Sequence, residues 1–302
     1  MTAQAQPDHR AALASLDMGT KRQLTTKSNR PAAFRLAMHV GTLGLALVGI
    51  ALGVPYWPVL LLPAGILMVF LFTLMHEATH RTAFENGRVN DGVAMVCGLV
   101  LFLPPAWFRY FHFAHHRHTQ DPERDPELAS AKPDTRLRYW LHVSGLPVWT
   151  SQIKALIRNA IWGAEDAFVP EAAQGLVRLE ARLMLVIYGA AAVLSYGVGS
   201  AFLVWCWIVP LLLGQPFLRL YLLAEHGNCP LVENMLANSR TTLTNRVVRW
   251  IAWNMPYHAE HHAWPIVPFH QLPHLHDHLR EHLGQVERGY TTFNRSYFER
   301  LR

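Results

Sequence analysis

The sequence predicts an all-α integral membrane protein with four transmembrane helices in two hairpins and a cytoplasmic helical cap that is rich in histidine. Three observations lead to this fold class. Of the 302 residues, 51% are hydrophobic and only 16% are charged, whereas charged residues make up about a quarter of a typical soluble domain. The apolar residues gather in stretches that approach the length of a membrane-spanning helix. Three groups of closely spaced histidines lie at or beyond the ends of these stretches.

The first predicted hairpin joins spans at about residues 33–53 and 58–76. Both stretches are almost free of charge, and about 20 apolar residues suffice to cross a hydrocarbon core of roughly 30 Å. The short connection contains Tyr56 and Trp57, and such aromatic residues are typical of the membrane–water interface. Residues 92–104 are apolar but too short to span, which predicts a re-entrant or interfacial segment.

The second predicted hairpin joins spans at about residues 182–200 and 201–224. Between the hairpins, residues 117–180 carry most of the mid-chain charge, which predicts a solvated region. Within it, Tyr139 to Ile161 has the composition of an amphipathic segment that lies on the membrane surface. Two hairpins return both ends of the membrane part to one side, and all three histidine groups fall on that side.

The chain divides into a basic arm at residues 1–30, a membrane domain at 31–283 and a C-terminal tail at 284–302. We expect the arm to be disordered or loosely docked, and its lysines and arginines indicate the cytoplasmic side. The net charge is +6, but no basic motif is interleaved with aromatics, so nucleic acid is not an expected partner. The three cysteines form no CxxC pair, which argues against an iron–sulfur or thiolate site.

The histidine groups have the spacing of metal ligands on helices. One group has the pattern HxxxH and two have the pattern HxxHH, and residues three or four apart lie on the same side of a helix. Neutral imidazole is the commonest side-chain ligand for iron, zinc and copper, and eight histidines are too many for one tetrahedral zinc. The spacing therefore predicts a site for two metal ions. The eight residues are His76, His80, His112, His115, His116, His258, His261 and His262.

These motifs together resemble the membrane-bound fatty acid desaturase superfamily, and within it the acyl-lipid desaturase branch. The resemblance rests on HEATH at 76–80, on Thr119 to Pro122 after the second group, and on Asn254 to Ala263 around the third. It covers roughly residues 33 to 283. It implies a non-haem diiron centre that uses O2 and external electrons to remove two hydrogens from the acyl chain of a lipid. Since no GxGxxG fingerprint is present, the electrons are expected from a separate ferredoxin or cytochrome b5 type of carrier.

The resemblance also assigns individual residues. The eight histidines match the iron ligands of the family, and His226 stands where desaturases of known structure have a ninth, near the end of the fourth helix. The family's asparagine one turn before that histidine is replaced by Leu222, so Asn228 or Asn254 is a candidate for holding a metal-bound water, or a plain hydrogen-bonding residue. Each ligand ring needs an acceptor for its second N–H. The candidate acceptors are Asp125, the first choice, and Glu77, Asp121, Glu225 and Glu260.

Three other functions remain open at this stage. A hydroxylase or ketolase of the same superfamily, acting on an alkane, sterol or carotenoid, would use the same site. A zinc-dependent membrane hydrolase would need fewer ligands and no electrons, and a non-catalytic metal carrier or sensor would bind metal without turnover. A further stripe, His274, His278 and His282, is predicted to be the polar face of an amphipathic helix instead of a metal site.

Overall fold

The computed structural model describes residues 8–302, and most of these residues are helical. Three helical segments are long and apolar enough to cross a membrane, namely Met18–Ala51, Trp57–Thr79 and Val204–His226. The pair Gly87–Leu101 and Pro105–His118 is a fourth candidate if it counts as one broken span, because it is bent by 102° at the break. The predicted helical membrane architecture is therefore confirmed at this level.

The first helical pair runs away from the cap and back again. α3 (Asn29–Ala51) leads to the 3-10 helix η1 (Trp57–Leu60), and the chain returns through α4 (Leu61–Val69) and α5 (Leu71–Thr79). Large apolar side chains such as Phe34, Leu45 and Val48 are exposed on α3. Since a soluble protein rarely exposes a continuous apolar surface of this kind, this face suits contact with lipid.

A sharp turn separates α6 (Gly87–Leu101) from α7 (Pro105–His118). Phe102 ends α6 in the left-handed conformation with φ 56°, and proline at the start of α7 cannot extend the preceding helix. The segment predicted as re-entrant or interfacial thus consists of the second half of α6 and this turn. The turn directs α7, which carries His112, His115 and His116, across the end of α5. The short 3-10 helix η2 (Pro126–Ala129) follows.

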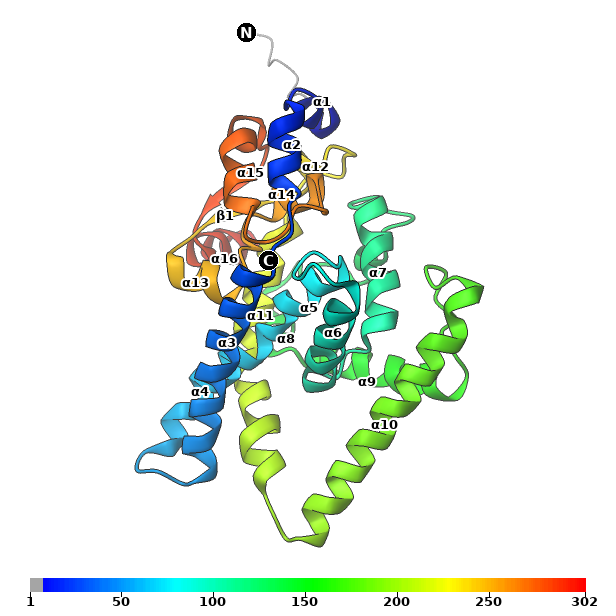
Figure 1. Cartoon of the computed structure of the whole chain (residues 1–302), viewed down its shortest axis with the longest axis vertical. Coiled ribbons are helices and arrows are strands. Elements are labelled where there is room, and N and C mark those ends of the chain that lie inside the picture. Colours follow the sequence, from blue (N-terminus) through cyan, green and yellow to red (C-terminus); the bar gives the residue numbers. More distant parts are fainter. Residues whose placement is uncertain (1–7) are drawn as a thin grey trace.

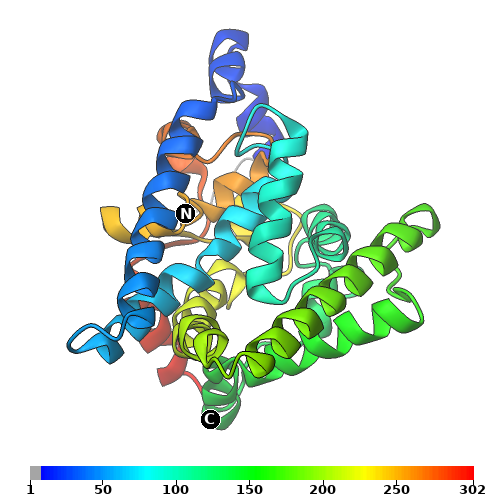
Figure 2. The ribbon, with the colours of Figure 1, turned by 60° about the horizontal axis from the view of Figure 1, so that its bottom comes forward.

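The predicted surface segment forms two helices, α8 (Arg136–Ser144) and α9 (Leu146–Ile161). They are separate because Gly145 adopts a φ of +73°, a conformation that ends a helix and suits glycine. After the 3-10 helix η3 (Glu171–Ala173), α10 (Gln174–Gly197) runs alongside α9 (Figure 2). α10 is not among the three apolar segments above, so the third predicted span stays a prediction.

The return helix α11 (Val209–His226), preceded by the π-helical turn η4 (Val204–Ile208), packs along α4. Two glycines allow this close approach. A Cβ on Gly214 would overlap the carbonyl oxygen of Gly65, and a Cβ on Gly65 would overlap the carbonyl oxygen of Pro210. Small residues are typical of contacts between membrane helices, because they let the backbones come together.

The C-terminal elements form the cap. They are α12 (Met235–Asn238), β1 (Thr241–Leu243), α13 (Arg246–Ile251), α14 (His258–Ala263), α15 (Leu272–Leu279), η5 (Arg280–His282), β2 (Val286–Arg288) and α16 (Tyr290–Glu299). The parallel pairing of β1 with β2, with Thr241 opposite Val286, was not predicted. The predicted tail is also part of the packed structure, since the Asn294 amide donates to the carbonyl oxygen of Leu220 on α11.

The expectation of a disordered or loosely docked arm was wrong for residues 8–30. This part forms α1 (His9–Ala14) and α2 (Met18–Leu24), whose first turn is capped by Asp17. It buries Ala12 and Leu24, and α2 packs against α15. The sequence did not reveal these two helices, because charged residues outnumber the few apolar residues that are buried. Residues 1–7 of the predicted arm lie outside the described residues.

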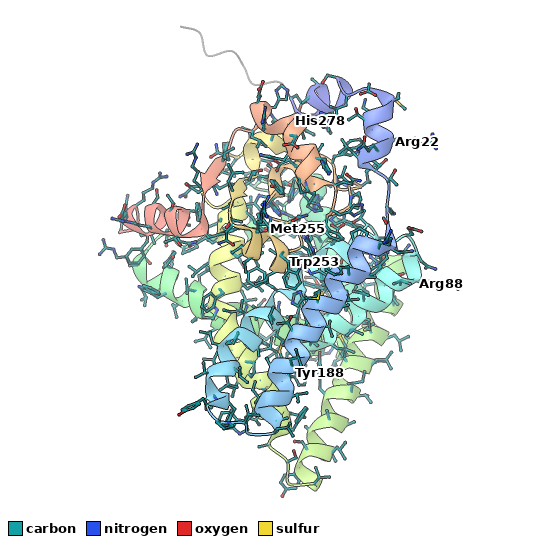
Figure 3. The ribbon with its side chains drawn as sticks, turned by 60° about the vertical axis from the view of Figure 1, so that its left-hand side comes forward. Arg22, Arg88, Tyr188, Trp253, Met255 and His278 are labelled. Atoms are coloured by element: carbon teal, nitrogen blue, oxygen red, sulfur yellow. The ribbon has the colours of Figure 1, made fainter. Side chains whose placement is uncertain are left out.

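The molecule has two distinct ends (Figure 1). The turn after α3 and the turn before η4 lie together at one end, and α12, α14 and α15 lie with α2 at the other. Figure 3 shows Trp253 and Met255 in the interior behind α3, and Arg22, Arg88 and His278 at the outer edges. The histidine groups therefore lie where the helical pairs meet the cap.

The contact between α4 and α11 gives a first testable prediction. Gly214→Ala places a methyl group against the Gly65 backbone, and overpacking of this kind costs about 1–3 kcal/mol of stability. We expect a lower melting temperature of the purified protein in detergent. Gly41→Ala is the matched control, because nothing lies within 4 Å of a Cβ at that position of α3. Equal melting temperatures of the two variants would contradict the proposed helix contact.

Candidate metal centre

The nine predicted ligand histidines come together from four helices. α5 contributes His76, and His80 caps its C-terminal end. The others lie on α7, at the end of α11 and on α14. Seven of the nine are buried, and His80 and His116 are half-buried. Segments separated by more than a hundred residues in the sequence thus share one enclosed space.

The imidazoles form two groups. One ring nitrogen from each member of a group lies within 4.8 Å of the corresponding nitrogens of the other members. The first group contains His76, His80, His112, His116 and His261, and the second contains His115, His226 and His262. His258 adjoins the second group, since its Nε2 lies 3.0 Å from Nε2 of His226.

Each HxxHH motif divides its histidines between the two groups. On α7, His112 and His116 belong to the first group, and His115 belongs to the second. On α14 the division is reversed, because His262 belongs to the second group and His261 to the first. Consecutive residues on a helix point about 100° apart, so each adjacent pair serves both groups. The rings of His116 and His262 stack at 4.0 Å where the groups meet.

Several of the grouped nitrogens are buried without a hydrogen-bond partner in the described chain. Nε2 of His76, Nε2 of His262 and both nitrogens of His116 and His261 are among these atoms. A buried polar atom without a partner is costly, and a metal ion satisfies a nitrogen lone pair. The donor set therefore fits two metal ions that favour imidazole.

Burial also favours the protonation state that a metal ligand needs. Desolvation lowers the pKa of His80 to about 3, with a smaller contribution from Arg109. Burial, and then the neighbouring imidazoles, hold the pKa of His258, His261 and His262 well below the usual value. These rings are neutral at pH 7, and neutral imidazole is the form that binds metal.

In the second group, Nδ1 of each of the three histidines has a hydrogen-bond acceptor outside the group. Nδ1 of His115 donates to Asp125 at 2.9 Å, and Nδ1 of His262 donates to the hydroxyl of Thr119 at 3.1 Å. Nδ1 of His226 donates to the carbonyl oxygen of Asn238 at 3.3 Å. Such bonds fix the ring orientation and leave Nε2 free to face a metal.

Comparison with known proteins identifies the family. The profile of the family named fatty acid desaturase matches residues 51–294. The chain belongs to the fatty acid desaturase family. The match begins later than the resemblance that the motifs gave, and it extends into α16. The histidine groups, which could hold metal ions, lie within the matched residues.

Curated relatives within this desaturase family have different activities. Beta-carotene 4-ketolase 3 of Haematococcus lacustris is 27% identical over 68% of this chain and 57% of its own length. A sphingolipid delta(4)-desaturase of Drosophila melanogaster is 28% identical over 69% and 61%. The dihydrorhizobitoxine desaturase of Bradyrhizobium elkanii is 27% identical over 72% and 66%. The chain spans less than two thirds of the length of each of these relatives.

Two of the predicted acceptors contact predicted ligand histidines. Asp125 does so as described, and it also accepts from the backbone N–H groups of Gln120 and Glu127. A carboxylate oxygen of Glu225 lies 3.4 Å from Nδ1 of His258. The sequence analysis missed Glu127, whose carboxylate lies 3.3 Å from Nε2 of His115 and pairs with Lys132. Its only sequence signal was its place two residues after Asp125.

The other predicted acceptors were wrong. Glu77 accepts from the backbone N–H of Phe269 at 2.9 Å and contacts no ligand ring. Glu260 accepts from His276 and from Thr241. Consecutive residues on a helix point about 100° apart, so Glu260 on the short helix α14 points away from the histidine groups. Asp121 caps the turn at Glu123 and pairs with Arg124 at the surface.

The role of Asn254 at a metal-bound water stays a prediction. The amide of Asn254 donates to the carbonyl oxygen of Phe269, which is the plain hydrogen-bonding role left open by the sequence. The predicted polar stripe behaves as expected, since His274 and His278 are exposed and belong to neither histidine group. His282 is half-buried and also lies outside both groups.

The metal content of purified variants tests which histidines are metal ligands. We expect His261→Ala to reduce bound metal and abolish activity, because it removes a nitrogen from the first group. His274→Ala is the control, since that side chain is exposed on α15. Inductively coupled plasma mass spectrometry of both purified proteins gives the metal per chain. Equal metal loss in the two variants would show that this assignment of ligands is wrong, and a single zinc per chain would favour a hydrolase.

The contact between Asp125 and His115 predicts a second effect on metal binding. Asp125→Asn weakens the acceptor for Nδ1 of His115, and changes at such supporting residues cost about 10–100-fold in metal affinity or activity. Metal affinity measured by competition with a chelator should fall by that order. Asp121→Asn is the control, since Asp121 contacts only the surface turn. An unchanged affinity in the Asp125 variant would refute the role of this contact.

Proposed function

We propose that this chain is an O2-dependent diiron oxidoreductase of the membrane, and that it introduces a double bond into the acyl chain of a lipid. The observation that carries the proposal is the convergence of nine imidazoles, seven of them buried and two half-buried. Eight form two adjoining groups, and His258 lies beside the second. The family match and the apolar helices support the membrane setting and the oxidative chemistry. The desaturase relatives support the reaction, although their identity to this chain is below 30%.

The residues of each group have a defined part in this proposal. Five imidazoles, those of His76, His80, His112, His116 and His261, would hold one iron. Three imidazoles, those of His115, His226 and His262, would hold the other, and His258 lies beside them. The two irons would supply the O2 and electron chemistry that amino-acid side chains lack. Asp125, Thr119 and Asn238 keep three of these rings in a single orientation through their outer nitrogens.

Aromatic side chains separate the histidines from the apolar interior. Phe72 stacks on His76 with ring centroids 6.3 Å apart, and Phe108 stacks on His112 at 5.3 Å. These rings exclude water from one side of the first group and present a surface that suits an alkyl chain. A reaction at an unactivated C–H bond benefits from such exclusion, because water in the site allows side reactions.

The proposal includes a membrane arrangement. Four spans in two hairpins within residues 31–283 would place the histidine groups, the arm at 1–30 and the tail at 284–302 on the cytoplasmic side. The lipid substrate would arrive from the bilayer. The electrons would come from a separate carrier of the ferredoxin or cytochrome b5 type that reaches the cytoplasmic face.

A hydroxylase or ketolase is the second candidate. The similarity to a beta-carotene 4-ketolase covers as much of this chain as the similarity to the sphingolipid desaturase, at nearly the same identity. The same metal groups could serve either reaction, and the position of the substrate relative to the oxidant decides between them. Specificity of this kind is a property of the substrate cavity and not of the histidines.

Products distinguish the two candidates. We expect cells that express the chain, fed with isotopically labelled fatty acid, to accumulate a lipid that has lost two hydrogens. Mass spectrometry of extracted lipids detects this change, and cells with the His261→Ala variant are the control. A product that has gained an oxygen instead, or labelled carotenoid converted in place of fatty acid, would establish the second candidate.

A further inference from the structure

A small cavity lies between α9 and α11, beside the histidine groups. Its volume is about 20 Å³, which is room for about one water. Its lining combines the apolar residues Phe72, Leu101, Leu103 and Leu218 with Trp149, Gln152, Gln215 and Arg219. The combination of an apolar wall and convergent polar groups is typical of a ligand site.

Two hydrogen-bond donors at this cavity have no partner. Arg219 is only 9% exposed, and its Nε is buried without a hydrogen bond. Within residues 8–302 the guanidinium forms no ion pair, and Glu225 and Glu127 act on it only electrostatically. Nε1 of Trp149 is likewise buried without a hydrogen bond. A buried donor without a hydrogen bond is unfavourable, so these two donors favour an acceptor that the described protein does not provide.

The cavity is next to the reacting centre of the proposed enzyme. Gln215, Arg219 and His226 lie on one side of α11, at intervals of four and seven residues. Seven residues of helix correspond to about 10 Å along the axis. Phe72 lines the cavity and stacks on His76. One aromatic ring thus separates the polar cavity from the first histidine group.

We propose that this cavity binds a carboxylate of the substrate, held by Arg219 with Trp149, while the alkyl chain passes Phe72 toward the histidines. The inference rests on the proposed function and adds the residues that hold the polar end of the substrate, an amphiphile whose acceptor oxygen lies several methylene groups from the reacting carbons. Both orphan groups are donors, so the ligand atom is an acceptor, and the charge of Arg219 favours an anion. A pure hydrocarbon leaves both groups unpaired. Because the cavity has room for only about one water, Trp149 or Phe72 moves when a chain enters.

Ligand binding tests the inference without any turnover. Radiolabelled hexadecanoate and hexadecane are bound to the purified full chain in identical detergent micelles. We expect hexadecanoate to bind more tightly than hexadecane, and Arg219→Gln to weaken hexadecanoate binding at least tenfold with hexadecane unchanged. Arg88→Gln is the matched control, since Arg88 is exposed on α6. Methyl hexadecanoate distinguishes an ester carbonyl from a free carboxylate, because only the acid gains from the charge.

A second variant protects the test against misfolding. Trp149→Phe removes one N–H and keeps the ring, and it should weaken hexadecanoate binding severalfold at an unchanged melting temperature. Hexadecanoate affinity within twofold of the wild type in both folded variants would overturn the inference, as would equal affinity of the wild type for acid and hydrocarbon. Selective binding of the acid without turnover of any lipid would instead overturn the proposed function.

Discussion

The structure depends on an enclosed space in which imidazoles from four helices face one another. Burial holds the pKa of His80, His258, His261 and His262 below the usual value. Several of the grouped nitrogens have no partner in the described chain. Polar atoms in that state destabilise a fold unless something satisfies them. Bound metal ions do this, and the free energy of binding then adds to the free energy of folding. The cost of burying these polar atoms together explains why so much of the surrounding structure holds the four helix ends in place.

Helix geometry explains why two adjoining sites arise from two copies of a short motif. Residues at i and i+4 share a side of the helix, whereas the residue at i+3 is rotated from i+4 by about 100°. α7 contributes His112 and His116 to the first group and His115 to the second. α14 contributes His262 to the second group, with His258 beside it, and His261 to the first. The adjacent pair His261 and His262 therefore links the two sites through one stretch of backbone. A shift of either helix by one residue would break both groups at once.

The sequence predicted the three apolar helical segments, eight histidines from their spacing in short motifs, His226 from the family resemblance, and Asp125 from its place behind the second motif. It could not predict the acceptors from distant segments. Thr119 and Asn238 are ordinary polar residues in the sequence, and only tertiary packing brings them to His262 and His226. Glu77 and Glu260 are adjacent to ligands in sequence, but neighbours on a helix face different directions. The docking of residues 8–30 was also hidden, since charge conceals the few apolar residues that are buried.

One helix connects the membrane contact, the cavity and the metal groups. α11 carries Gly214 against α4, then Arg219 at the polar cavity, and then His226 in the second histidine group. Because α11 is one continuous helix from Val209 to His226, with Pro216 inside it, the positions of these three residues along its axis are not independent. A polar substrate group held at Arg219 would therefore lie at a set distance from the metals, measured in turns of α11. The choice of which carbon reacts would then depend on that spacing, and the close packing of Gly214 on Gly65 would maintain it.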